Sequence, residues 1–264
     1  MSEDNQMLTF GGHLEVLRRM LFRVLVATAV FACAIFCFKD ITFDLLLAPS
    51  QSDFILYRWI EQFLAMLGSD FHFAPFEVDL IATDLSSQFM THISTSLYLG
   101  LLCASPYILF ELFRFISPAL YENERKYSIP VLLTIYTLFI VGVLMSYFIL
   151  FPISFRFLGT YSVAEQVRST ITLDSYISTF VTLTLVMGVV FQLPVIAYFL
   201  AKLGFIDGEM LAKYRQYAFL IIMIVAAVIT PPDLMTLVLV TIPLYLLYEV
   251  SIIVTKRVKI NEPL

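Results

Sequence analysis

The chain has 264 residues, of which 60% are hydrophobic and 14% are charged, and its formal net charge is −5 at pH 7. Soluble domains carry about 25% charged residues, so this composition excludes an ordinary soluble protein and indicates a polytopic membrane protein. The N-terminal residues are polar and acidic, without the basic segment that opens a secretory signal, so we expect no cleaved signal peptide.

Six apolar segments predict membrane-spanning helices. A helix needs about 20 apolar residues to cross a hydrocarbon core about 30 Å thick. The expected spans lie at about 20–38, 90–113, 129–151, 175–200, 216–230 and 234–254. We therefore predict an all-α integral membrane protein, with residues 1–264 forming a single six-helix membrane domain.

The segment between the first two spans, about 39 to 91, is long for a connection in a compact protein. Within it, residues 54–67 (FILYRWIEQFLAML) place apolar side chains, Trp59 among them, on one helical face, and Arg58, Glu61 and Gln62 on the other. This pattern predicts an amphipathic helix at the outer membrane interface, with Trp59 as its anchor.

Basic residues set the orientation. With a cytoplasmic N-terminus, 12 of the 16 Lys and Arg residues fall in cytoplasmic segments. Only Lys39, Arg58, Arg156 and Arg168 fall outside. The positive-inside rule therefore places both termini in the cytoplasm.

The later spans carry two further signals. The fifth span is short, because its 14 residues from Gln216 to Ile229 make a helix of only about 21 Å. Prolines interrupt several spans, and because each removes a backbone donor, we expect bent helices that form a cupped wall. The prolines are Pro106, Pro130, Pro152, Pro194 and Pro243.

Motifs of enzymes are missing from the sequence. It contains no nucleotide-binding loop, no dinucleotide fingerprint and no HExxH, and its three His residues are scattered. The three Cys residues lie in apolar runs, which is typical of packing. We expect no enzymatic activity, no cofactor, no metal and no nucleic-acid partner.

Polar groups inside the membrane are functional candidates, because an ion costs about 2.5–3.5 kcal/mol at mid-membrane on insertion scales. Glu111 and Gln192 lie at comparable depth in the second and fourth spans. They are either a functional polar pair or a structural hydrogen bond worth about 1 kcal/mol. For Glu249, near the inner end of the sixth span, we favour simple exposure at the interface.

Acidic residues on the cytoplasmic side form a second group. Glu15 precedes the first span within "HLEVLRR" (13–19), and Glu122 and Glu124 lie between the second and third spans. They are either solvated loop charges or an anionic site for a cationic ligand, because a carboxylate binds a guanidinium in a bidentate manner.

At these residues the chain resembles the TatC family, the multispanning core subunits of the twin-arginine protein translocase. The motifs occur in family order over nearly the whole chain. They are "HLEVLRR" (13–19), "LLAP" (46–49), "IATD" (81–84), "FRFISPALYENERK" (113–126), "FPISFRFL" (151–158), "FQLPV" (191–195) and "TPPD" (230–233).

The resemblance implies a receptor for signal peptides with consecutive arginines. It also implies a translocase core in a prokaryotic cytoplasmic membrane that moves folded proteins with the proton gradient. The implied partners are single-span TatA/TatB-type subunits, docked at the short fifth and sixth helices, and further copies of the chain. The implied signal-peptide site comprises Glu15, Arg18, Phe115, Pro118, Leu120 and Glu124. Pro49 and Asp233 match outer-side positions.

Two positions depart from the family pattern. Where many members carry Glu in H-L-x-E-L-R, this chain has Val16, and its acid is Glu15. Where many members carry Glu in the fourth span, this chain has Gln192, and Glu111 is the candidate to supply the missing acid.

A secondary transporter is the alternative, with Glu111 and Glu249 as proton or ion sites. The sequence shows no convincing repeat between its three-helix halves, which a transporter would favour.

Overall fold

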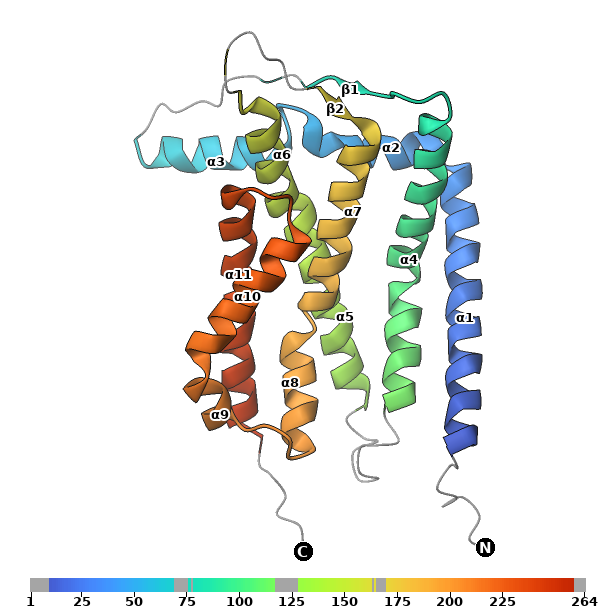
Figure 1. Cartoon of the computed structure of the whole chain (residues 1–264), viewed down its shortest axis with the longest axis vertical. Coiled ribbons are helices and arrows are strands. Elements are labelled where there is room, and N and C mark those ends of the chain that lie inside the picture. Colours follow the sequence, from blue (N-terminus) through green and yellow to red (C-terminus); the bar gives the residue numbers. More distant parts are fainter. Residues whose placement is uncertain are drawn as a thin grey trace, which may run out of the picture. The chain divides into compact units, whose positions relative to one another are not determined.

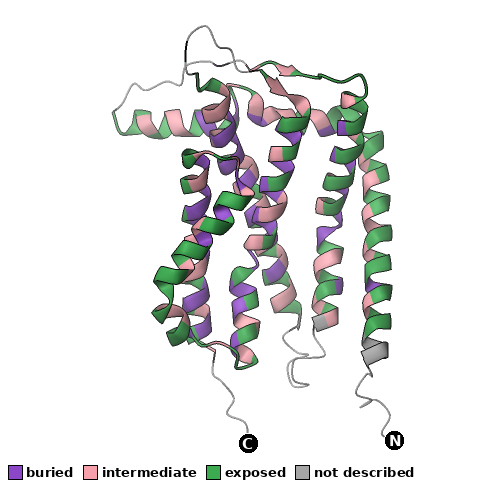
Figure 2. Ribbon diagram, viewed as in Figure 1, coloured by how far each residue is buried: buried purple, intermediate pink, exposed green. Residues whose placement is uncertain are grey.

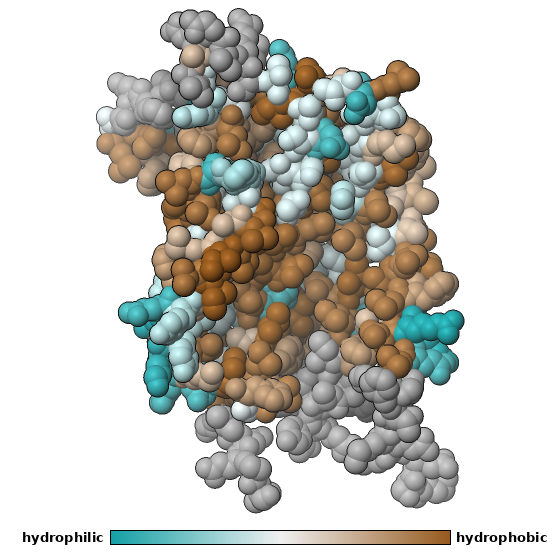
Figure 3. Space-filling model, viewed as in Figure 1, coloured by the Kyte–Doolittle hydropathy of each residue, from teal (hydrophilic) through white to brown (hydrophobic). Residues whose placement is uncertain are grey.

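The computed structural model describes residues 10–68, 76, 78–116, 128–162, 164 and 170–258. In these ranges five helical stretches are long and apolar enough to cross a membrane (Figure 1). They are Leu14–Cys37, Ser87–Phe115, Ile129–Thr160, Leu173–Lys202 and Leu234–Lys256. A sixth apolar helix, Arg215–Ile229, is shorter. The prediction of an all-α membrane protein is confirmed, and surface colouring shows apolar residues along the helices (Figure 3).

The chain forms two compact units. The first comprises Met1–Lys39 and His92–Tyr136, and the second comprises Asp40–Thr91 and Thr137–Leu264. Two expectations, the single domain and the cupped wall, concern how these parts are arranged and stay predictions.

In the first unit, α1 (Phe10–Cys37) packs against α4 (Ser87–Ile116). A Cβ on Gly100 would lie 2.7 Å from the backbone nitrogen of Ala32, so the two helices approach through small residues. The rings of Phe36 and His92 stack nearby, with centroids 4.2 Å apart. Only 6% of the apolar window in α1 is buried, so most of its side chains stay exposed beside the face that packs on α4.

The second unit begins with the outer segment. It contains α2 (Lys39–Leu47), the 3₁₀ turn η1 (Ala48–Ser50), α3 (Ile55–Met66) and β1 (Leu80–Ile81). β1 pairs in parallel with β2 (Ile171–Thr172), which leads into the fourth span. The amphipathic helix expected within 54–67 is therefore present as α3.

Side chains from the spans complete the end of α2. The last carbonyls of a helix have no partner within it. Tyr147 donates its hydroxyl to the carbonyl of Leu45 at 2.8 Å, and Tyr176 donates to that of Leu46 at 2.7 Å. Both bonds tie the outer segment to the third and fourth spans.

The third span runs further than the sequence suggested. It is built from α5 (Ser128–Met145), a π-helical turn η4 (Ser146–Leu150) and α6 (Phe151–Thr160). Pro152 cannot donate a backbone hydrogen bond, and the π turn before it adjusts the hydrogen-bond pattern. The helix therefore passes the proline and continues to Thr160, instead of ending near 151.

The fourth span is divided in a similar way. It comprises α7 (Leu173–Val190) and α8 (Leu193–Lys202), separated by a turn at Phe191–Gln192 just before Pro194. Buried positions concentrate on α5 to α8 (Figure 2), and the windows of the third and fourth spans are 44% and 56% buried. The core of the second unit lies between these two spans.

The chain ends with α9 (Gly208–Lys213), α10 (Arg215–Ile229) and α11 (Leu234–Lys256). At 15 residues α10 is short, as expected. Pro243 and, in the first unit, Pro106 lie inside continuous helices. Of these four prolines, only Pro194 follows a break between two helices, whereas the span passes Pro152 through a π turn.

Candidate functional site

The inner end of α1 presents an exposed charged cluster. Glu15 accepts a hydrogen bond from Nη2 of Arg19, one helical turn later, and both side chains are more than half exposed. Such exposed pairs contribute only about 0–1 kcal/mol, so Glu15 can exchange Arg19 for another cation at little cost. Arg18 is exposed beside them and has no ion-pair partner within the described ranges.

The rest of the predicted signal-peptide site lies near the inner end of α4. Phe115 is half-buried in the last turn of this helix. Pro118, Leu120 and Glu124 lie outside the described residues, so their roles stay predictions. The structure thus describes Glu15, Arg18 and Phe115 of this site.

The intramembrane acid Glu111 belongs to an ion pair within the first unit. Its side chain is 4% exposed, and its Oε1 accepts hydrogen bonds from Nη1 of Arg23 at 3.0 Å and from the Tyr107 hydroxyl at 3.1 Å. Arg23 comes from α1 and is 43% exposed, so the pair joins α1 to α4. The sequence assigned Arg23 to topology and missed this partner.

Gln192 is buried and precedes α8 as its N-cap residue, within the second unit. Its predicted pairing with Glu111 would join the two units and stays a prediction.

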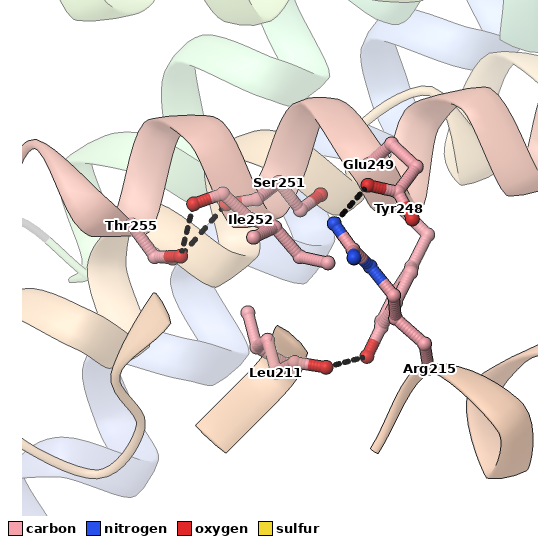
Figure 4. A network of polar contacts seen from close by, with 7 residues as sticks. All are labelled: Leu211, Arg215, Tyr248, Glu249, Ser251, Ile252 and Thr255. Atoms are coloured by element: carbon pink, nitrogen blue, oxygen red, sulfur yellow. Dashed lines mark hydrogen bonds and ion pairs between the residues drawn. The ribbon is translucent and has the colours of Figure 1, made fainter. Parts of the chain in front are cut away.

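The second intramembrane acid, Glu249, also has a cation. Arg215 at the start of α10 donates from Nη2 to Oε2 of Glu249 in α11 at 2.8 Å (Figure 4). The neighbouring Tyr248 donates to the carbonyl of Leu211 in α9 at 2.7 Å. Glu249 therefore links α11 to α10, and Tyr248 links α11 to α9, at the inner end of the span. The sequence did not predict the partner of Glu249.

The hydroxyls of Ser251 and Thr255, further along α11, bond within their own helix. Ser251 donates to the carbonyl of Leu247 at 2.8 Å. Thr255 donates to the carbonyls of Ser251 and Ile252 at 2.8 and 3.1 Å (Figure 4). They need no partner on another helix, which leaves Arg215–Glu249 and Tyr248–Leu211 as the polar links drawn between α11 and its neighbours.

The two outer-side positions have structural roles. Pro49 is buried in η1, directly after α2. Asp233 is the N-cap of α11, where its Oδ1 accepts a hydrogen bond from the backbone N–H of Thr236 at 2.7 Å. The turn between α10 and α11 therefore ends on a capped helix.

The cap gives a direct expectation. Asp233→Ala should destabilise the chain by about 1 kcal/mol, because a helix donor loses its acceptor. Asp233→Asn keeps an oxygen in the same place and should stay close to wild type. Denaturant unfolding in detergent micelles measures both, and equal loss in the two variants would contradict a capping role.

An aromatic cage on the outer side was not expected from the sequence. The Arg156 guanidinium in α6 lies 5.0 Å from the ring centroid of Tyr57 and 4.8 Å from that of Phe76. Tyr57 donates its hydroxyl to the carbonyl of Pro152 at 2.8 Å. Burial raises the pKa of Tyr57 to about 12, against a lowering effect of the Arg156 charge, so Tyr57 stays protonated and keeps this bond.

Known proteins are similar to this chain along most of its length. The family model described as Sec-independent protein translocase protein (TatC) matches residues 12–243. The TatC protein of a Blattabacterium from Periplaneta americana is 36% identical over 262 residues, covering 96% of this chain and 97% of its own length. The TatC protein of Aquifex aeolicus is 37% identical over 218 residues, covering 76% and 90%.

Solved structures agree with these likenesses. A crystal structure of the twin-arginine translocase receptor TatC superposes with a TM-score of 0.73 at 35% identity, covering 92% of this chain and 98% of that one. A second crystal structure of that receptor, in the detergent DDM, gives a TM-score of 0.74 at 35% identity. With a family match over most of its length, relatives along nearly all of it and the same helical fold, the chain belongs to the TatC family of Sec-independent protein translocase subunits, multispanning proteins of the prokaryotic inner membrane.

Proposed function

We propose that this translocase subunit is the receptor for twin-arginine signal peptides and the core through which folded proteins cross the membrane, driven by the proton gradient. The observation that carries the proposal is Glu15, an exposed carboxylate at the inner end of α1 whose guanidinium partner Arg19 is itself exposed. A carboxylate in this state is ready to bind an incoming arginine.

We propose that Glu124 is the main contact of the paired arginines and that Glu15 assists it. Glu124 matches the acid with which relatives meet the paired arginines, and it shares the cytoplasmic side with Glu15. Arg18, Phe115, Pro118 and Leu120 complete the surface. The proposed role is binding without a catalytic step, so the subunit is a receptor and not an enzyme.

The proposed partners are single-span subunits of the TatA and TatB type and further copies of this chain. A helix of 15 residues such as α10 spans only about 22 Å, which is less than the usual hydrocarbon thickness. The mismatch is relieved when a partner helix covers it or when the bilayer thins beside it. We therefore place partner docking at α10 and α11.

Two observations weaken the transporter alternative. Its candidate ion sites, Glu111 and Glu249, are each paired with an arginine, Arg23 and Arg215 respectively. An ion-paired carboxylate is already neutralised, and a transported proton or cation would have to displace that arginine first. The receptor function needs such an exchange only at Glu15, whose pair with Arg19 is exposed and weak.

Peptide binding tests the receptor function. The wild-type chain in detergent should bind a peptide with consecutive arginines more tightly than the same peptide with Lys-Lys, because lysine lacks the planar fork. Glu124→Ala should weaken binding about 10- to 100-fold, since hydrogen bonds to charged groups contribute about 1.5–3 kcal/mol. Glu15→Ala should have a smaller effect, because Glu15 must first release Arg19.

Glu209→Ala provides the matched control. Glu209 is an exposed acid in the first turn of α9, on the same side of the membrane but outside the proposed surface. It should bind the peptide as wild type does. If neither Glu124→Ala nor Glu15→Ala changed the affinity, the site assignment would be wrong.

A further inference from the structure

Helix α3 exposes an apolar stripe that no residue in the described part of the chain covers. Its stripe consists of Ile55, Trp59, Phe63 and Met66, which are 41%, 61%, 63% and 85% exposed. Since successive residues turn by 100°, Trp59, Phe63 and Met66 project within about 60° of one another. Single exposed apolar residues are ordinary on a protein surface, but an aligned stripe marks a surface that contacts something apolar.

The buried face of α3 lies beside this stripe. Leu56 and Tyr57 are buried, at 9% and 2% exposure. Arg58, Glu61 and Gln62 project on the remaining arc, where Arg58 pairs with the exposed Asp53. The circumference of α3 therefore has three parts: a buried apolar face, the exposed apolar stripe, and a polar arc.

The roll of α3 about its axis is fixed. The Tyr57 hydroxyl is bonded to the Pro152 carbonyl, and the Tyr57 ring lies against Arg156 and Phe76. The Phe54 ring, just before the helix, stacks on Phe148 of η4 with centroids 6.0 Å apart. The stripe therefore cannot turn inward to hide its side chains.

The height of α3 follows from the same contacts. Pro152 and Arg156 belong to α6, which forms the outer end of the third span. α3 lies across the direction of α6 near this end (Figure 1). The stripe thus emerges where the hydrocarbon gives way to headgroups, the level at which membrane proteins concentrate Trp.

We propose that α3 inserts its stripe into the outer leaflet at the boundary between acyl chains and headgroups, so that the occupant of this surface is lipid. The adjoining η4 turn of the third span also exposes an apolar side chain, Ile149, at 39%. Polar residues on the remaining arc are left to face headgroups and water, as in an interfacial amphipathic helix.

The size of the stripe favours lipid over a second protein. A helix of 12 residues is about 18 Å long, and one face of it offers far less than the ~800 Å² per partner of a stable protein interface. A bilayer sets no such minimum, because insertion scales with whatever apolar area is offered.

Trp59 is the only tryptophan of the chain, so the native protein reports on its own stripe. The full chain is reconstituted in phosphatidylcholine vesicles whose acyl chains carry bromine near the glycerol end, at mid-chain or near the methyl end. Because an interfacial helix buries its apolar face about 5–10 Å into the boundary, we expect strong quenching of Trp59 by the shallow bromines, weaker quenching by the deep ones, and little by aqueous acrylamide.

Two variants in a Trp59→Phe background supply the controls. Phe63→Trp keeps the reporter on the stripe and should reproduce the bromine profile. Arg58→Trp moves it about 100° round the helix from Trp59, to the exposed polar arc, and should be quenched by acrylamide instead. Quenching of Trp59 by acrylamide alone would show a hydrated surface and overturn the proposal. Quenching by neither agent would show that protein covers the stripe, which also overturns it.

Discussion

Arg23→Leu should destabilise the chain by about 2–3 kcal/mol, close to the cost of an uncompensated charge at mid-membrane. Among the described residues, the variant leaves Glu111, which is 4% exposed, with the Tyr107 hydroxyl as its hydrogen-bond donor. Glu111→Leu should cost less, because Arg23 is 43% exposed and its long side chain can reach the interface. Unfolding in detergent micelles measures both variants.

The double variant Arg23→Leu/Glu111→Leu tests the coupling. Removing both partners of a buried pair is often neutral, so we expect the double variant to be more stable than Arg23→Leu alone. Arg19→Leu is the matched control, because it breaks an exposed pair on the same helix and should cost about 0–1 kcal/mol. Strictly additive losses in the double variant would show that Arg23 and Glu111 do not interact.

Transport measurements on the same variants separate structure from function. If Glu111 supplies the acid that many relatives carry in the fourth span, Glu111→Ala should impair transport even where the chain remains folded, and Glu111→Gln should show whether the charge is needed. Unchanged transport in Glu111→Ala would rule out this replacement and leave Glu111 with its structural role beside Arg23.

Gly142→Leu should cause the largest loss within the second unit. A Cβ on Gly142 would lie 2.6 Å from the carbonyl oxygen of Met187 and 2.9 Å from Cγ of Phe191. The first of these atoms is backbone, so α5 and α7 have to separate. Overpacking costs about 1–3 kcal/mol, which we expect for Gly142→Ala, and Gly142→Leu should exceed that range.

Val141→Leu is the matched control for this prediction. Val141 precedes Gly142 in α5 but is 46% exposed, so the same leucine placed there meets lipid and should change stability little. Thermal unfolding in detergent, monitored by the loss of resistance to protease, compares the variants. Similar stability of Gly142→Leu and Val141→Leu would contradict the close approach of α5 and α7.

The sequence predicted the helices because their signal is local. A run of apolar residues identifies a span without reference to anything distant, and the same is true of the amphipathic pattern of α3. The reach of the third span was harder to predict, because Pro152 reads as a helix end. Only the structure shows the π turn at Ser146–Leu150 that lets the helix pass it.

Polar partners were not predictable in this way. Glu111 meets Arg23 across 88 residues, and Arg215 meets Glu249 across 34. An arginine at the inner end of a span satisfies the positive-inside rule whether or not it also forms an ion pair. The positions of Arg23 and Arg215 therefore gave no sign that they pair with acids. A useful signal is the coincidence of an intramembrane acid with an arginine at matching depth on another span.

The tyrosine bonds at the end of α2 bear on biogenesis. The carbonyls of Leu45 and Leu46 accept hydrogen bonds from tyrosine hydroxyls that lie 102 and 130 positions later in the chain. During synthesis from the N-terminus, those donors do not yet exist when α2 reaches the outer surface. The end of α2 therefore remains hydrated until the third and fourth spans have been inserted, and the exterior of this protein is completed only after most of its membrane-embedded part.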